Sequence, residues 1–399
     1  MLNDDHVKFW RLKRAARLVQ HHIAEYGRSL FSFRIRKNVK KHQLKYLESL
    51  ELQKKRKIII FFVPSSDRVT GGRLQIFSLY RISQSLFDGT DVAVLMCWLP
   101  GQGHDVFRVS GHRNDVTVCP FTMVLRQCQL DCEMLLHFPE FAAPYLCNDL
   151  LGWKWLRQNA KQRSLHINIL NQNIDSMVNK SFVRSLQDTH CKVTITAAPS
   201  HWASRDEQDR MGAPIHWLPT WYYPDSAEWQ PYETKRDLLI VSPDRSEYRD
   251  MVLDAIRRGL PDLEVKVIQG IPFEEYTELE KLAKWSITFG EGCDGFFYGP
   301  AMRGGVSFAV YNDTFAGWNT ADWQTLYETY QAMATRIVDD IQRLDKKIEY
   351  EKYSHRLRDR FTRYRSLEAL QRQLTDFYSG NYSLHPLHAE ENTASAGFH

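Results

Sequence analysis

The chain has 399 residues, of which 43% are hydrophobic and 25% charged, a composition that predicts two domains with substantial cores. No run of about 18 apolar residues occurs and the first residues lack an apolar core region, so neither a transmembrane helix nor a signal peptide is expected. The seven cysteines are scattered without a Cys-x-x-Cys pair, which argues against a zinc ribbon or a disulfide framework and fits a cytoplasmic protein.

The net charge of +4 conceals a strong asymmetry along the chain. Residues 1–57 carry 16 Lys and Arg against 5 Asp and Glu, a balance of +11. The remainder carries 36 against 43, a balance of −7. A basic head on a mildly acidic body makes an anionic surface a candidate partner.

Residues 6–50 are expected to form basic helices with interleaved Trp and Phe, within an extension that covers 1–56. Basic amphipathic helices of this kind can lie on anionic membranes, so residues 1–50 are candidates for peripheral contact with the inner face of the cytoplasmic membrane. The alternatives are a helix packed on its own domain or a dimer contact in a homo-oligomer. No recognised nucleic-acid-binding module accompanies the charge, so nucleic acid is not predicted as a partner.

The next part of the chain alternates short apolar runs with helical patterns. The first run, 57–63, is followed by the Gly71-Gly72 turn and an amphipathic helix, and further runs are found at 92–97, 134–137, 166–170 and 193–196. This rhythm indicates an α/β domain with a mainly parallel sheet over residues 57–220.

Polar residues follow several of these predicted strands. In parallel α/β sheets, ligands collect beyond the carboxyl ends of the strands. The candidates at those ends are Asp67 and Arg68 in the first loop, His137 with Glu140, and the Asn171-Gln172-Asn173 run. A strand-end His suits acid–base work or a sugar hydroxyl, whereas a lone His is more often structural. The Asn run fits hydroxyl binding and plain turn chemistry equally well.

Residues 221–236, dense in proline and aromatic residues, predict a linker. A second Rossmann-like domain is expected over 237–320, and it opens with a buried strand at 237–242. Arg245 and Arg249 follow four residues apart; if both lie in or beside the first turn of a helix they share a face and can neutralise a diphosphate. The alternative is a surface pair bonded to neighbouring acids.

The stretch 286–312 is predicted to be a strand, a turn rich in glycine and acids, a brief helix and a second strand. The turn contains Gly290, Glu291, Gly292, Asp294 and Gly295, and the helix is expected to begin near 295–296. Its N-terminal amides would suit an anionic ligand, a diphosphate above all. Glu291 and Asp294 would accept hydrogen bonds from sugar hydroxyls. A tight turn with solvated acids is the alternative interpretation.

Residues 321–384 are predicted to be long helices that either cross back over the first domain or form a coiled contact. The polar tail, 385–399, is expected to be disordered.

Two Rossmann-like halves, a linker, a Gly-Gly turn and an acid–Gly turn together resemble a GT-B glycosyltransferase over about residues 57–330. The likeness is nearest to the retaining family four and to polysaccharide-assembly relatives, which carry E-G-F-G-L-P-x-L-E-A-M-A-x-G. Here Glu291-Gly292, Gly295-Phe296 and Ala301-Met302-x-Gly304 echo that motif. The second Glu of the motif is absent, because Gly299 or Pro300 stands in its place.

The resemblance implies transfer of a sugar from a nucleotide-sugar to a growing polysaccharide or lipid-linked glycan, possibly with retention of configuration. No Asp-x-Asp motif occurs, so no metal and no other cofactor is expected. The alternatives are a non-catalytic GT-B-like glycan-binding or assembly component and an NDP-sugar epimerase. The predicted site has catalytic residues Glu291 and His137, donor-binding residues Gly71, Gly72, Arg245, Arg249, Gly292, Asp294, Gly295, Phe296 and Phe297, and acceptor-binding residues Asp67, Arg68, Glu140, Asn171 and Asn173.

Overall fold

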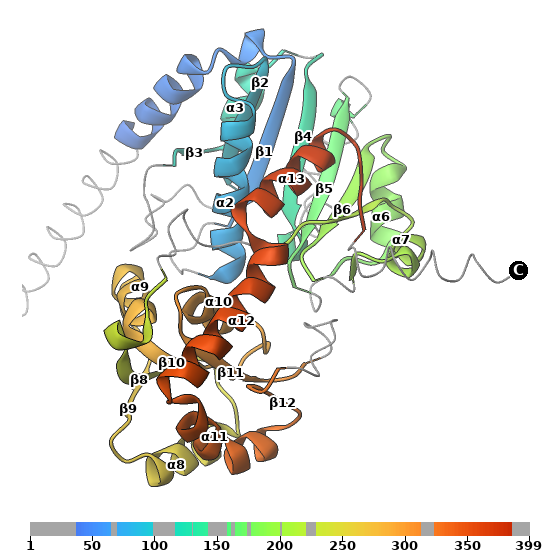
Figure 1. The fold of residues 1–399 in the computed structure, drawn as a ribbon. Coiled ribbons are helices and arrows are strands. Elements are labelled where there is room, and N and C mark those ends of the chain that lie inside the picture. The colour runs from blue at the N-terminus through green and yellow to red at the C-terminus, as the bar shows by residue number, and fades with distance from the viewer. Residues whose placement is uncertain are drawn as a thin grey trace, which may run out of the picture.

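The computed structural model describes residues 37–64, 70–98, 116–129, 131–142, 158–160, 164–173, 177–199, 202–220, 229–312 and 323–384. These residues form two parallel sheets, each flanked by helices, with a helical C-terminal arm that runs along both (Figure 1). The predicted α/β architecture, with mainly parallel sheets, is confirmed.

The first sheet has seven strands in the order β3-β2-β1-β4-β5-β6-β7. Its centre is the Ile-Ile-Ile-Phe-Phe-Val run of β1, which is completely buried because neighbouring strands and covering helices enclose both faces. Every strand pair in this sheet is parallel. The strands are β1 Lys57–Val63, β2 Val92–Trp98, β3 Val118–Cys119, β4 Glu133–Pro139, β5 Leu165–Asn171, β6 Lys192–Ala197 and β7 Ile215–Trp217.

The second sheet has five parallel strands in the order β12-β11-β10-β8-β9. The strands are β8 Arg236–Val241, β9 Glu264–Val267, β10 Ala283–Ile287, β11 Val306–Val310 and β12 Leu326–Tyr327. In each sheet the chain adds strands on one side of the first strand and then crosses to the other side. This change of direction falls between β1 and β4 in the first sheet and between β8 and β10 in the second. Doubly wound sheets bind ligands at such switch points, outside the carboxyl ends of the strands.

The helices between the strands cover the sheet faces with apolar stripes. In α2, for example, Ile76, Leu79 and Tyr80 are buried against the first sheet. The helices of the first half are α2 Gly71–Leu86, α3 Phe121–Gln127, α6 Lys180–Gln187 and α7 Arg205–Met211. Those of the second half are α8 Arg249–Gly259, α9 Phe273–Leu282 and α10 Gly295–Met302.

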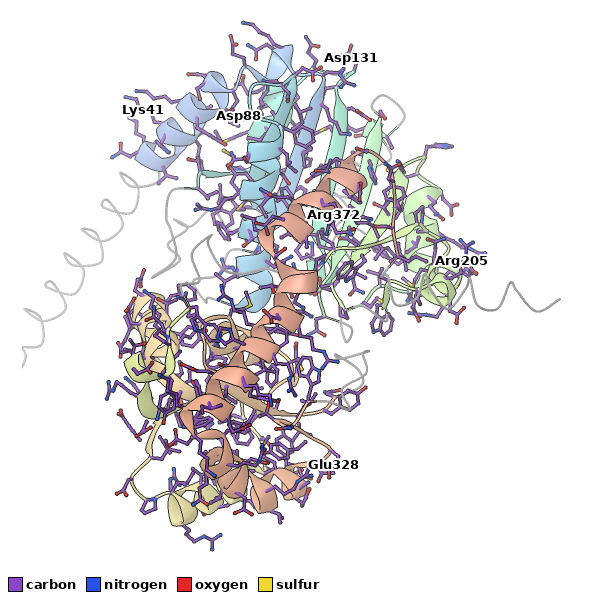
Figure 2. The ribbon with its side chains drawn as sticks, viewed as in Figure 1. Lys41, Asp88, Asp131, Arg205, Glu328 and Arg372 are labelled. Carbon is purple, nitrogen blue, oxygen red and sulfur yellow. The ribbon has the colours of Figure 1, made fainter. Side chains whose placement is uncertain are left out.

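The expected C-terminal helical tract is confirmed as three helices, α11 Tyr330–Leu344, α12 Lys347–Arg365 and α13 Leu367–Tyr378. Tyr350 and Phe361 of α12 are buried in the core of the second sheet. Leu370 and Phe377 of α13 are buried on the first sheet. Of the two predicted arrangements, the arm therefore adopts the one that crosses back over the first domain, and Arg372 of α13 lies over it in Figure 2.

Residues 37–49 form a helix at the outer side of the first domain. Leu47 is buried in the first core, and Gln43 Nε2 donates to Val118 O at 2.6 Å. The opposite face is exposed, as Figure 2 shows for Lys41. This part of the extension therefore packs on its own domain, while residues 1–36 lie outside the described part of the chain.

Some predictions fall partly or wholly on residues that the structure does not describe. The predicted linker lies mostly outside the described residues, since 221–228 are not among them, and so does the tail 385–399. Across the described ranges, no helix combines the length and apolar character needed to span a membrane. The six cysteines in those ranges are all free thiols, in agreement with the expected lack of a disulfide framework.

Candidate functional site

The carboxyl ends of the two sheets meet at a hydrogen bond between the domains. Asn173, two residues beyond β5, donates from Nδ2 to Glu291 Oε1 in the turn after β10, at 3.5 Å. Around this contact lie residues that follow β4 and β5 and the start of α2. We call Gly72, Glu140, Gln172, Asn173 and Glu291 the junction cluster; four of its five members are predicted site residues.

Gly72 allows the start of α2 to approach the end of β5. The helix begins at Gly71, as the sequence predicts, and Thr70 Oγ1 caps it by accepting from the N–H of Arg73 at 3.4 Å. A Cβ placed on Gly72 would stand 2.7 Å from Gln172 Oε1. Glycine at this position therefore lets the α2 terminus and the strand-end polar residues share one small region.

Glu140 comes directly after β4 and is 4% exposed. Its Oε1 accepts a hydrogen bond from the Asn173 N–H at 3.2 Å. Burial raises the pKa of the Glu140 carboxyl to about 7; hydrogen bonds from backbone N–H groups oppose this rise, and the charge of Glu291 adds to it. Glu140 is thus close to half-protonated at neutral pH.

The turn between β10 and α10 lies where the sequence predicts it, but two backbone N–H groups at the start of α10 bond to a side chain of the protein itself. Asp294 Oδ1 accepts from the N–H groups of Phe296 and Phe297 at 2.9 and 3.2 Å, and Thr288 Oγ1 donates to Asp294 Oδ2 at 2.6 Å. The N-terminus of α10 is therefore capped by its own carboxylate. Both amides are therefore bonded within the protein in this conformation, and contact of a diphosphate with the amides of residues 292–295 stays a prediction.

The Asp294 carboxyl is also less exposed to solvent than the alternative interpretation, a tight turn with solvated acids, would have it. Burial raises the pKa of its carboxyl to about 7; the hydrogen bonds lower it, and the nearby Asp244 carboxylate raises it. The two carboxylates approach each other over Gly290, where a Cβ would stand 2.9 Å from Asp244 Oδ2 and 3.0 Å from Asp294 Oδ2. The sequence predicts an acidic turn, but it did not indicate that Asp244, from the loop after β8, comes close to Asp294.

His137 is a correction to the predicted site. The strand β4 continues two residues past it, to Pro139, and the His137 side chain is fully buried. Its ring stacks on Phe61 at 4.3 Å between centroids and lies 5.6 Å from Phe377 of α13. Asn168 Nδ2 donates to its Nδ1 at 3.0 Å, and burial holds its pKa well below the usual value. A neutral, enclosed imidazole cannot touch a donor sugar, so the predicted catalytic contact is wrong.

The predicted arginine pair does not share a helical turn. The helix α8 begins at Arg249, and Arg245 lies in the preceding loop with an exposed side chain. Arg249 Nη1 donates to the Asp244 backbone O at 3.2 Å, a contact with the main chain and not with a carboxylate of the kind that the surface alternative names. Both guanidiniums nonetheless follow β8, at the carboxyl edge of the second sheet.

The remaining predicted residues divide into three groups. Asn171, at the end of β5, is buried and donates from Nδ2 to Met177 Sδ at 3.3 Å. Asp67 and Arg68 lie outside the described residues. Gly292 lies in the turn before α10, and Gly295 is the first residue of that helix, where the sequence places its start.

Arg365, which the sequence analysis missed, brings a cation to the same region. It ends α12, donates from Nη1 to Thr220 Oγ1 at 2.6 Å and lies over the Tyr298 ring at 4.1 Å from its centroid. Its charge also acts to lower the pKa of the Cys293 thiol, which burial, the larger effect, raises to about 12. No local pattern signals this role, because Arg365 reaches the turn only through the path of the C-terminal arm.

Replacing Gly292 with alanine is expected to lower the free energy of unfolding by about 1–3 kcal/mol. Gly292 has φ +89°, and an added Cβ would stand 3.0 Å from the Val310 O. Gly295→Ala is the matched control, since no atom lies within 4 Å of its Cβ position; we expect a change of no more than about 1 kcal/mol. Urea unfolding of both variants measures the difference, and equal stabilities would contradict the proposed strain at Gly292.

No protein-family model and no curated protein matches the chain. Solved structures with a similar fold include HepE from Anabaena in complex with UDP and glucose, at 10% identity over 80% of this chain and 99% of that one, with a TM-score of 0.43. An alpha,alpha-trehalose 6-phosphate synthase from Burkholderia multivorans is 10% identical over 81% and 99%, with a TM-score of 0.46. MnaA from S. aureus with UDP is 9% identical over 83% and 99%, with a TM-score of 0.42.

The chain's own topology, two doubly wound parallel sheets whose carboxyl edges meet, is the two-part α/β architecture expected from the sequence.

Proposed function

We propose that the chain is a glycosyltransferase that moves a sugar from a nucleotide-sugar to a hydroxyl of a growing polysaccharide or lipid-linked glycan. The observation that carries this proposal is the Asn173–Glu291 contact, which joins the carboxyl edges of two doubly wound sheets. Each edge is a ligand-binding position in folds of this class. Two facing edges suit a reaction that brings a donor and an acceptor together.

In this proposal the second sheet binds the donor. Glu291 is exposed and offers carboxylate oxygens to sugar hydroxyls. Arg245 and Arg249, after β8, and the start of α2 at Gly71-Gly72 would meet the charge of the diphosphate. These groups supply positive charge without requiring a metal ion.

Thermal unfolding of the wild-type protein against UDP-, GDP-, dTDP- and CMP-sugars tests the proposal. A donor that binds the folded state raises the midpoint temperature, and the stabilisation grows with the logarithm of its concentration over its dissociation constant. We expect a shift with one nucleotide class and release of its diphosphate on addition of a glycan acceptor. A folded protein that responds to none of these donors would overturn the proposal.

A non-catalytic GT-B-like glycan-binding or assembly component is the second candidate. It is favoured by Pro300, which is buried inside α10 where the resemblance calls for a glutamate. That side chain offers no hydrogen bond to a ribose. Donor binding without any release of sugar or nucleotide, with or without acceptor, would support this candidate over the enzyme.

Contact with an anionic membrane is a further part of the proposal. The helix at 37–49 exposes Lys37, Lys40, Lys41 and Lys45, in the basic first segment of the chain. Such a surface would hold the enzyme near a lipid-linked acceptor. Sedimentation with vesicles that contain or lack anionic lipid tests it; equal binding to both would count against it.

A further inference from the structure

One carboxyl oxygen of Glu140 has no partner in the described structure. Oε1 accepts from the Asn173 N–H, but Oε2 is fully buried and makes no hydrogen bond with any described residue. Gln172 Nε2, just beyond the neighbouring strand β5, is likewise buried and unbonded within those ranges. Buried polar atoms nearly always have partners, and exceptions are common where a ligand or a reacting group belongs. Glu140 Oε2 is therefore able to accept a hydrogen bond from a hydroxyl.

Asn173 fixes this carboxyl relative to the opposite domain. Its backbone N–H binds Glu140 at 3.2 Å, and its side-chain Nδ2 binds Glu291 at 3.5 Å. One residue thus holds the strand-end carboxyl of the first sheet close to the turn carboxylate of the second. A hydroxyl bound at Glu140 Oε2 would lie at the meeting point of the two sheets.

We propose that Glu140 is the general base of the sugar transfer, with Oε2 accepting the proton of the acceptor hydroxyl. This inference rests on the proposed function. The acceptor oxygen forms a bond to the anomeric carbon of the donor sugar, and the bond from that carbon to the diphosphate oxygen breaks. The electron pair leaves with the diphosphate, and the hydroxyl proton moves to Glu140.

The direction of attack follows from a base placed on the acceptor. A hydroxyl activated in this way displaces the diphosphate from the opposite face, so the product is expected with inverted anomeric configuration. This departs from the retention implied by the sequence resemblance. A transfer that retains the anomeric configuration in one direct step would need no protein base at the acceptor. The Glu140 carboxyl would then have no role in the reaction.

Burial and the Glu291 charge give Glu140 the proton affinity that this step needs. A general base works best when its pKa lies near the operating pH, and the Glu140 carboxyl, at about 7, meets that condition. Only the ionised carboxyl accepts a proton, so the rate should rise as the pH rises through 7. If the carboxyl had an ordinary pKa, the rate would no longer rise with pH above pH 6.

The experiment compares the wild type, Glu140→Gln and the control Glu133→Gln with the donor that gives the largest thermal shift. Glu133 begins the same strand at its far end, where it is partly exposed and pairs with Lys57. Glutamine matches the shape of glutamate, so the thermal midpoint without donor should stay close to that of the wild type. Release of sugar to water, with no glycan added, is followed between pH 5 and 9, with and without azide.

We expect Glu140→Gln to bind the donor normally but to release sugar about 100-fold or more slowly than the wild type. Its rate should no longer rise with pH near pH 7. Glu133→Gln should behave as the wild type. Azide, an anionic nucleophile with no proton to lose, should restore turnover in Glu140→Gln as an inverted glycosyl azide. Unchanged sugar release in Glu140→Gln, no rescue by azide, or a retained product would overturn the role of Glu140. A wild type that binds none of the donors would overturn the proposed function itself.

Discussion

Glu291→Gln is expected to lower kcat/KM for sugar transfer by about 100-fold while leaving the fold unchanged. Hydrogen bonds to a charged group contribute about 1.5–3 kcal/mol, which corresponds to roughly 10- to 100-fold in rate when they act on the transition state. Glu291 is exposed, so its replacement removes no buried contact. Steady-state kinetics with the donor found by thermal unfolding measures the loss.

The same substitution should move the pH dependence as well as the rate. The Glu291 charge helps to raise the pKa of Glu140. Without that charge, the limb that reports Glu140 should shift toward lower pH. Glu328→Gln is the control, because Glu328 is exposed at the far end of the second domain (Figure 2). If Glu291→Gln transfers sugar at the wild-type rate, Glu291 does not contact the donor.

Phe377→Ala is expected to destabilise the first domain by about 3–5 kcal/mol, the usual cost of removing a buried phenylalanine ring. Phe377 is 2% exposed, and its ring lies 5.6 Å from the rings of both His137 and His216. The substitution leaves a cavity between α13 and the sheet. Hydrogen exchange should become faster in β1 and β4 and remain unchanged in β10, which belongs to the other core.

The arm also offers a control for this substitution. Ile348 lies on α12 with 78% of its surface exposed, and Ile348→Ala should change the free energy of unfolding by less than about 0.5 kcal/mol. A loss below about 1 kcal/mol for Phe377→Ala would mean that α13 contributes little to the first domain.

Local sequence was sufficient to predict the longer buried strands and the turn before α10, but not the two-residue strands β3 and β12. Strands such as β1 are continuous apolar runs, and their number and alternation with helices determine the fold class. The capping role of Asp294 was also within reach of the sequence, because aspartate just before a helix is a standard cap signal. The diphosphate interpretation overlooked that competing use of the amides.

The errors arose where distant segments determine the environment of a residue. His137 was placed at a strand end because the apolar run was counted to that position, whereas pairing of Phe138 and Pro139 with β5 extends the strand. Its burial depends on Phe377, which lies 240 positions further along the chain. Arg365 reaches the turn by the same long path, which no local pattern records.

The path of α13 has a consequence for how the protein is made. The core on the first sheet contains Phe61 near one end of the chain and Phe377 near the other. Because ribosomes synthesise proteins from the N-terminus, all seven strands of this sheet emerge before the helix that covers them. The uncovered apolar face is exposed during that interval, when such surfaces are prone to aggregate. Nascent chains halted before Leu367 should therefore bind chaperones that recognise apolar segments, and should be released once α13 has docked.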